Sequence, residues 1–260
     1  MMIDKPSGKK ESILKNFSRY AHLYDKYANI QALAACELIK MSCAGSIGHV
    51  LELGCGTGNY TYLLRQRYRD ADITATDISE KMISQGRRKL NGENIKFIIA
   101  DAEEFDPGDR FDLVTSNAAF QWFDDQEMAI QKYRRAISEG GFLLFSIFGP
   151  STFRELGESL RVILGEGTSI STDGFLGKGR LKAMLERHFG TVVVTELVVK
   201  ERYPSLLELL RKIRYTGTRG SGTGSTLLWK RETLDKVEEA YKEKFGAIEA
   251  TYQIFLCKAK

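Results

Sequence analysis

Short runs of apolar and β-branched residues alternate with helical stretches along most of this 260-residue chain. Such runs, bounded by turn residues, predict β-strands. The predicted strands are 49–53, 72–77, 95–100, 111–116, 142–147, 192–199 and 251–257. Between the first five lie stretches such as 60–68 and 79–90, which have the length of ordinary helices. The alternation predicts an α/β fold, with a seven-stranded, mostly parallel sheet covered by helices on both faces.

One edge of such a sheet is where function is expected. Right-handed crossovers place the carboxyl ends of the strands on the same edge, so the residues that follow them converge on a ligand. We expect a single domain over 1–260 with its cofactor-binding core at 49–147. Three segments fall outside the alternation: an N-terminal helical cap at 1–41, helical from 12, and the inserts 150–179 and 204–246, interpreted as lid or substrate-recognition elements. Within the last insert, the glycine-rich run 217–225 predicts a mobile loop.

Composition excludes several classes of protein. No apolar run is long enough to cross a membrane, and the N-terminus lacks the apolar segment of a signal peptide, so we expect a cytoplasmic protein without a membrane partner. The formal charge of +4 does not by itself indicate nucleic-acid binding, and none is expected. No C-x-x-C pair is present, which argues against a disulfide frame or a zinc site, and no metal is expected. The cysteines are Cys36, Cys43, Cys55 and Cys257, and the histidines are His22, His49 and His188.

A glycine-rich turn follows the first predicted strand and precedes a helix. Gly54, Gly56 and Gly58 allow close approach of the backbone to a ligand. Their spacing does not match the dinucleotide fingerprint, which counts against a nicotinamide oxidoreductase. Asp77 ends the second strand, where a carboxylate can accept bonds from both ribose hydroxyls of an adenosine. The alternative is that Asp77 caps the helix beginning near Ser79.

Four segments in order, 52–58, 77–79, 101–103 and 111–117, resemble the successive motifs of the Rossmann-like class I methyltransferases, which use S-adenosylmethionine and release S-adenosylhomocysteine. The resemblance implies that the glycine turn meets the methionine part, Asp77 the ribose, and Asp101 the adenine amino group. Ile78 and Met82 would flank the adenine, although a methionine at helical spacing is more often core. The implied cofactor residues are Tyr24, Gly54, Gly56, Asp77, Ile78, Met82, Asp101, Ala102, Asn117 and Ala118.

A narrower resemblance concerns the acceptor. The segments 17–31, 116–122, 153–156 and 251–254 are similar to signatures of the malonyl-acyl-carrier-protein O-methyltransferases of biotin synthesis. That family masks the malonyl carboxylate as a methyl ester, so that the primer can pass through fatty-acid elongation toward pimeloyl. The resemblance implies S-adenosylmethionine and malonyl-acyl-carrier protein as substrates.

A carboxylate acceptor needs no general base, because it is ionised at neutral pH. The predicted catalytic residues are Tyr24, Gln121, Trp122 and Arg154. Arg154 can fork two hydrogen bonds to the carboxylate, Tyr24 and Gln121 complete a polar wall, and Trp122 with Phe120 excludes water. Alternatively, Arg154 forms a surface pair with Glu158, and Trp122 belongs to the core.

The family also implies an acidic carrier protein, for which a basic cluster is present at 200–219, at the start of the second insert and just before it. Its members are Lys200, Arg202, Arg211, Lys212, Arg214 and Arg219. The alternative is a solvated helix face. Three other functions stay open: methylation of another small acid such as aconitate, methylation of a quinone-like hydroxyl, and a non-catalytic S-adenosylmethionine-binding module.

Overall fold

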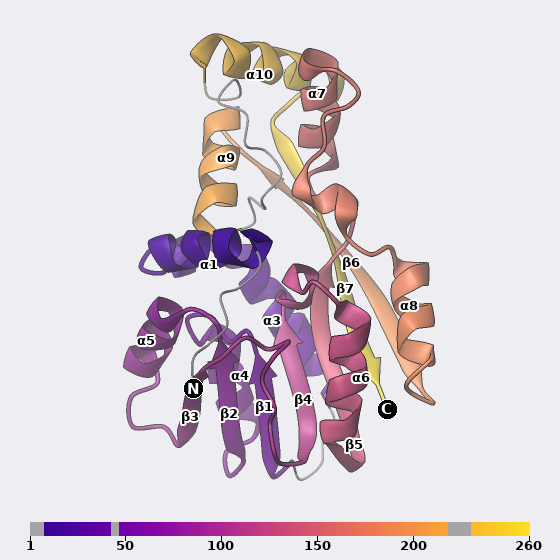
Figure 1. Ribbon diagram of the computed structural model, residues 1–260. Helices are drawn as coiled ribbons and strands as arrows, with labels where there is room; N and C mark the ends of the chain where they lie inside the picture. Colours follow the sequence, from indigo (N-terminus) through magenta and orange to yellow (C-terminus); the bar gives the residue numbers. More distant parts are fainter. Residues whose placement is uncertain (1–7, 43–46, 218–229) are drawn as a thin grey trace.

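One mixed sheet organises the molecule, in a computed structural model that describes residues 8–42, 47–217 and 230–260 (Figure 1). Its strands lie in the order β3-β2-β1-β4-β5-β7-β6. The bounds are β1 His49–Leu53, β2 Asp72–Asp77, β3 Ile95–Ile99, β4 Phe111–Asn117, β5 Ile137–Phe148, β6 Val192–Arg202 and β7 Glu249–Ala259. The predicted seven-stranded, mostly parallel sheet is therefore confirmed.

β7 departs from the simplest expectation. It lies between β5 and β6 and runs antiparallel to both. Its carboxyl end is consequently at the opposite edge from the other six, so the expectation that all strands end at one edge is wrong for β7. The helices between β6 and β7 lie beyond the carboxyl end of β6, so β7 begins at that end and runs back along β6 in the reverse direction (Figure 1).

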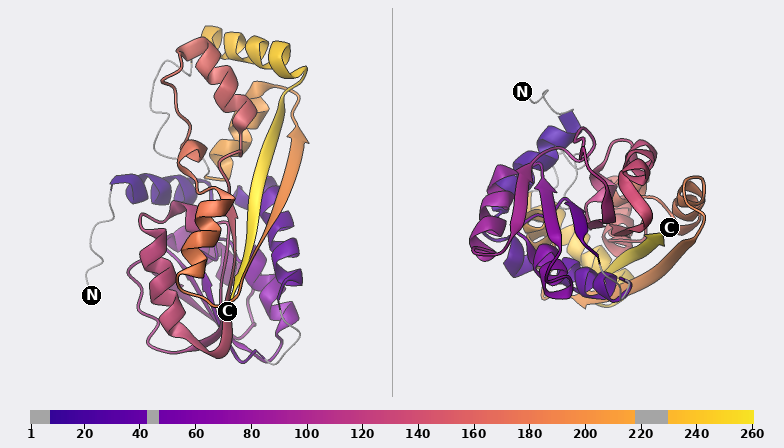
Figure 2. Two further views of the ribbon diagram at one scale, coloured as in Figure 1. Left: turned by 90° about the vertical axis from the view of Figure 1, so that its right-hand side faces the viewer. Right: turned by 90° about the horizontal axis from the view of Figure 1, so that it is seen from below.

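Helices cover both faces of the sheet, as predicted (Figure 2). Residues of α3 (Asn29–Lys40) and α4 (Asn59–Arg67) join a buried cluster on one face, and those of α6 (Gln126–Ala136) and α8 (Lys178–Glu186) join a cluster on the other. The helix α5 (Glu80–Lys89) packs against β2 and β3. The predicted helices 60–68 and 79–90 correspond to α4 and α5 with ends shifted by one residue.

Most of the segments outside the alternation lie beyond the carboxyl edge of the sheet, while α3 lies against one of its faces (Figure 1). The predicted N-terminal helical stretch is divided into α1 (Gly8–Tyr20), α2 (Tyr24–Tyr27) and α3, and α1 crosses above this edge. The first insert contains α7 (Arg154–Leu164) and the short 3-10 helix η2 (Ser171–Gly174). The second contains α9 (Leu206–Tyr215) and α10 (Arg231–Phe245), and its glycine-rich run lies outside the described residues beyond Gly217.

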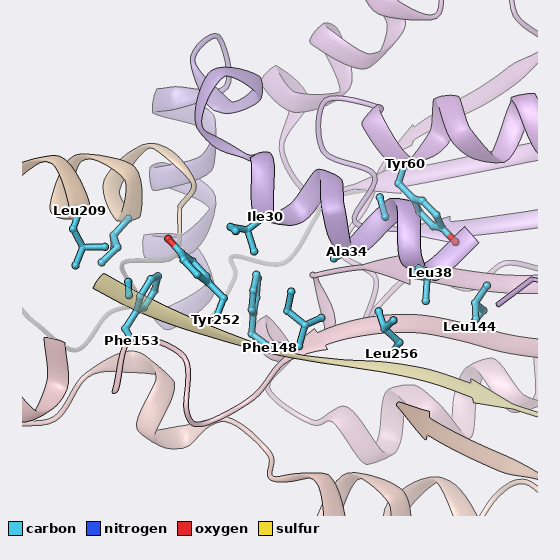
Figure 3. Close-up of a cluster of buried hydrophobic side chains, with 14 of the residues drawn as sticks. Ile30, Ala34, Leu38, Tyr60, Leu144, Phe148, Phe153, Leu209, Tyr252 and Leu256 are labelled. Carbon is cyan, nitrogen blue, oxygen red and sulfur yellow. The ribbon is translucent and has the colours of Figure 1, made fainter. Parts of the chain in front are cut away.

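A continuous hydrophobic cluster joins the sheet to these upper helices (Figure 3). Ile30 of α3 and Phe148 of β5 belong to it, together with Leu209 of α9. Between them, the rings of Phe153 and Tyr252 pack edge to face at 5.0 Å. Buried apolar contact of this kind fixes the position of α9 above the sheet. No helix within the described ranges is long and apolar enough to span a membrane.

Candidate active site

The chain turns sharply after β1. Gly54, Gly56 and Gly58 have φ of 69°, 55° and 82°, a region that glycine adopts without strain. Gly54 also has no room for a side chain, since a Cβ there would lie 2.5 Å from the Cβ of Ala119. Both Gly54 and Gly56 line a cavity at the carboxyl edge, so the turn presents backbone atoms to it.

This cavity collects residues that are far apart in the sequence. Every residue predicted to contact the cofactor lines it: Tyr24, Gly54, Gly56, Asp77, Ile78, Met82, Asp101, Ala102, Asn117 and Ala118. Strand ends supply most of them because the parallel strands finish at this edge. Their individual contacts with a cofactor stay predictions.

Asp77, at the end of β2, is held by the backbone. Its Oδ2 accepts a 2.9 Å hydrogen bond from the N–H of Gly56, and its Oδ1 accepts one of 2.8 Å from Ser79. Burial raises the pKa of the carboxyl to about 6, although these N–H groups favour the ionised form. Ser79, not Asp77, caps α5, because its side chain accepts from Met82 N. The alternative role of Asp77 as that helix cap is therefore wrong.

Opposite Asp77, the wall comes from the segment after β3 and from α1. Lys10 of α1 lies 2.7 Å from both Asp101 Oδ2 and Glu103 Oε2. The other oxygen of Asp101 accepts from the N–H of Glu103. Ile13 and Phe17 of α1 also line the cavity. The sequence did not predict that α1 lines the cavity. The helical spacing of Ile13 and Phe17 was visible, but by itself it indicates only that one face of the helix is buried.

A corner with unusual backbone geometry follows β4. Ala118 has φ 54°, and its N–H donates to Ser146 Oγ at 2.9 Å. Ser146 Oγ donates in turn to Asn117 Oδ1 at 2.7 Å, while Asn117 Nδ2 donates to the carbonyl of Gln31. These bonds fix the corner between the cavity and α3.

Glu52 of β1 is a further residue that the sequence did not predict as part of the site. It is fully buried in β1, and neither of its carboxylate oxygens has a hydrogen-bond partner within the described part of the chain. Burial raises its pKa to about 8; the nearby hydroxyl of Thr61 opposes this rise, and the charge of Asp77 adds to it. It borders a smaller cavity that shares Gly54, Gly56 and Asn117 with the first. The signal was available, because an acidic residue inside an otherwise apolar strand requires a partner.

Aromatic rings line the side of the cavity where the acceptor is predicted to bind, which we call the acceptor side. Trp122, in the 3-10 helix η1 (Phe120–Trp122), lines the cavity beside Phe17 at a ring distance of 6.2 Å. Its other neighbour is Phe175, at 5.8 Å. Burial raises the pKa of Tyr24 far above its usual value, so this phenol stays neutral near pH 7. Phe120 packs instead on Phe145 in the core, so its predicted place on the acceptor wall is wrong.

Two predicted catalytic side chains do not reach the cavity wall. Gln121 is buried behind the corner and donates to the carbonyl of Ala118 at 2.6 Å. Arg154, at the start of α7, is 52% exposed and donates its Nε to Glu155. Glu158 pairs with Lys244 rather than with Arg154, so the alternative surface pair is also wrong. The role of Arg154 toward an acceptor stays a prediction.

The basic cluster at 200–219 is mostly neutralised. Lys212 is buried and bonded to Glu201 and Asn29, so its predicted place on a docking surface is wrong. Arg211 pairs with Glu208. Lys200 and Arg202 both pair with Glu249. Arg219 lies outside the described residues.

Comparisons with known proteins agree with this geometry. Residues 50–141 match the family model described as a methyltransferase domain. A protein of Ilyobacter polytropus named malonyl-[acyl-carrier protein] O-methyltransferase 2 is 30% identical over 238 residues, 91% of each chain. A Bacillus anthracis protein of the same name, without the number, is 36% identical over 225 residues, 83% of each chain.

Two solved structures share the fold. The YcgJ protein of Bacillus subtilis superposes with a TM-score of 0.60 at 14% identity, covering 87% of this chain and 97% of that one. An S-adenosylmethionine-dependent methyltransferase of Thermotoga maritima gives 0.56 at 15% identity, covering 95% and 99%. Fold, cavity and relatives together define a class I S-adenosylmethionine-dependent methyltransferase, and the chain belongs to that family. Within it, the chain is a relative of the proteins named malonyl-[acyl-carrier protein] O-methyltransferase.

The residues present suit this cofactor chemically. The unpartnered carboxylate of Glu52 complements an ammonium group beside the glycine turn. Asp77 offers acceptors for ribose hydroxyls, and Ile78 and Met82 offer apolar surface for an adenine. The two adjoining cavities therefore offer a buried carboxylate, Glu52, on one side of the glycine turn, and apolar surface beside further carboxylates on the other. An amino-acid-bearing nucleoside presents the complementary groups.

Proposed function

We propose that this chain transfers the methyl group of S-adenosylmethionine to the free carboxylate of a malonyl thioester on an acyl-carrier protein, in biotin (pimeloyl) synthesis. The observation that carries the proposal is the similarity, at 30% and 36% identity over most of the chain, to relatives named for this reaction. The acceptor side of the cavity is compatible with it.

When bound, the cofactor supplies a methyl group whose bond to sulfur breaks as the acceptor oxygen takes it up. A malonyl carboxylate is already ionised near pH 7, so the chain has no proton to remove. Trp122 and Phe17 exclude water from this region, and Tyr24 offers a neutral hydroxyl to a carboxylate oxygen. Alignment and a partly dehydrated site are the contributions that such a displacement needs.

Methylation of another small carboxylic acid is the second candidate, since the same features would serve it. A hydroxyl acceptor fits less well, because no histidine or cysteine is among the described residues that line the cavity, and its carboxylates Asp101 and Glu103 are paired with Lys10. If the chain is a non-catalytic binding module, it should bind S-adenosylmethionine and transfer no methyl group.

The test is a turnover assay with methyl-labelled S-adenosylmethionine and three acceptors: malonyl-acyl-carrier protein, malonyl-CoA and aconitate. We expect label on the malonyl group, released as methanol by mild alkali because the product is an ester. Label on aconitate alone would overturn the malonyl assignment. Cofactor binding without transfer to any acceptor would favour the binding module.

A further inference from the structure

The outer face of α1 carries unpaired positive charge directly above the cavity. Ile13 and Phe17 of this helix line the cavity. Lys15 follows Ile13 by two positions, and Arg19 follows Phe17 by two. Two positions correspond to about 200° around a helix, so Lys15 and Arg19 point away from the cavity. Both are exposed. The helix α1 therefore presents Ile13, Phe17 and the ion-paired Lys10 to the cavity, and it presents Lys15 and Arg19, together with one exposed carboxylate, Glu11, to the outside.

Three tyrosines connect Arg19 to a further cation on α2. The guanidinium of Arg19 lies 5.5 Å from the ring of Tyr20, and Lys26 Nζ lies 5.7 Å from the ring of Tyr27. Both rings pack on Tyr215 of α9, at 5.1 and 4.7 Å. The two cations therefore border one aromatic cluster. We call this surface the basic–tyrosine patch, made of Lys15, Arg19, Tyr20, Lys26, Tyr27 and Tyr215.

The cations of the patch differ from those of the second insert. Among the described residues, no carboxylate forms an ion pair with Lys15, Arg19 or Lys26. By contrast, Arg211 and Lys212 are paired with glutamates. Lys15 and Arg19 stand four positions apart in one helix, where like charges repel. Their charge is thus free to meet a partner.

We propose that the basic–tyrosine patch docks the acyl-carrier protein. The inference rests on the proposed function, and it names the surface that delivers the malonyl group. An acidic helix of the carrier would meet the three cations, and the partly buried tyrosines supply the apolar anchor that protein interfaces favour. A carrier bound there sits on the outer wall of the cavity, next to the acceptor side formed by Phe17 and Trp122.

Three cations suit a small acidic protein better than the other anionic partners. Duplex nucleic acid is generally held by about 6–10 phosphate contacts. Recognition of an anionic membrane generally takes clusters of about 4–8 basic residues. Neither number is reached by this patch.

The test compares two double variants with equal changes in charge. One is Arg19→Glu/Lys26→Glu. The matched control is Arg69→Glu/Arg135→Glu, at exposed positions that precede β2 and end α6, toward the opposite edge of the sheet. A neutral variant, Arg19→Gln/Lys26→Gln, guards against a folding defect from charge reversal. For each protein we would measure KM for malonyl-carrier protein and for malonyl-CoA, and the Kd for labelled apo-carrier protein.

We expect reversal in the patch to raise the carrier KM and Kd by about tenfold or more, and the malonyl-CoA KM by less than about twofold. The neutral variant should show a smaller loss of the same kind, and salt at ~0.5 M should shrink both differences. The control should change neither substrate. An equal rise in KM for both substrates would overturn the proposal, and so would an equal effect in the control variant. Binding to anionic vesicles is measured in parallel. If reversal in the patch weakens vesicle binding and leaves carrier binding unchanged, the proposal is also overturned. If the wild type methylates no malonyl substrate, the proposed function fails, and the Kd for apo-carrier protein alone then decides whether the patch binds it.

Discussion

Ser146 Oγ donates a 2.7 Å hydrogen bond to Oδ1 of Asn117 and so ties β5 to the last residue of β4. The same hydroxyl accepts from the N–H of Ala118, the residue with φ 54° at the rim of the cavity. One buried hydroxyl thus holds both the side chain and the backbone of this corner.

Removal of that hydroxyl should weaken cofactor binding without unfolding the protein. In Ser146→Ala, Asn117 Oδ1 loses its donor, and we expect the Kd for S-adenosylmethionine to rise about tenfold, the equivalent of ~1.4 kcal/mol. Ser159→Ala is the matched control, because Ser159 is equally buried but donates to a carbonyl within α7. Isothermal calorimetry measures both. Equal affinities in the two variants would show that the Ser146 bond is only structural.

Glu52 should make cofactor binding depend on pH. At pH 7 the free protein holds this carboxyl mostly protonated, because its pKa is raised to about 8. An ammonium group nearby favours the ionised form, so binding should release a proton and strengthen as pH rises toward 8. Calorimetry in buffers of different ionisation enthalpy counts the protons. Binding by Glu52→Gln should be weaker, with less proton release.

The same residue should affect the stability of the cofactor-free protein. The pKa of Glu52 is near 4.5 in the unfolded chain and about 8 in the folded protein. The contribution of Glu52 to the free energy of unfolding is therefore fully present below pH 4.5 and is lost as pH rises through 8. Glu52→Gln should remove this fall, a gain on the order of 2–4 kcal/mol at pH 9. Denaturant unfolding at pH 5 and ~9 tests it; parallel pH profiles for both proteins would contradict it.

Asp77 should bind the ribose through its charge. Asp77→Asn keeps one acceptor oxygen for the N–H of Gly56 but sets its NH2 against the N–H of Ser79, so a modest loss of stability is expected. Affinity for S-adenosylmethionine should fall by more, roughly 10- to 100-fold. Since burial raises the pKa of Asp77 to about 6, wild-type affinity should also decline as pH falls below that value. If a folded Asp77→Asn protein binds S-adenosylmethionine with nearly wild-type affinity, Asp77 supports the glycine turn and does not bind the ribose.

Gly54→Ala and Gly56→Ala separate two demands on the glycine turn. Both positions have positive φ, which costs an alanine about 1–2 kcal/mol. Only at Gly54 would the new Cβ also meet another atom within 4 Å, the Cβ of Ala119. Thermal unfolding should therefore show a larger loss for Gly54→Ala. Equal losses would mean that the segment containing Ala119 moves aside without cost.

Arg154→Ala tests the predicted carboxylate fork. If Arg154 exchanges its bond with Glu155 for the malonyl carboxylate, the variant should raise the malonyl KM by about tenfold and leave cofactor affinity unchanged. Arg154→Lys should recover little, because an ammonium cannot form the fork. Unaltered malonyl kinetics in Arg154→Ala would remove this residue from the site.

The cofactor side of the cavity was predictable because its signals are local. The strand β1 is followed at once by the glycine turn, and β2 ends on Asp77, so the sheet topology alone brings them together. The acceptor side was not predictable in the same way. Phe153 has φ 60°, which sets the direction in which Arg154 leaves the chain, and nothing in the sequence signals that value. Lys212 meets Asn29 across 183 positions of sequence, a contact that charge counting cannot reveal.

The position of β7 also determines the order in which the molecule can be completed. During synthesis, β1 to β5 can pair once Phe148 has emerged from the ribosome, because they are contiguous in the sheet. β6 pairs with β7 alone in the described structure, so it has no neighbour until Glu249–Ala259 has emerged. In a nascent or truncated chain that lacks these residues, we therefore expect the strands around the cofactor cavity to be formed and β6 to remain unpaired.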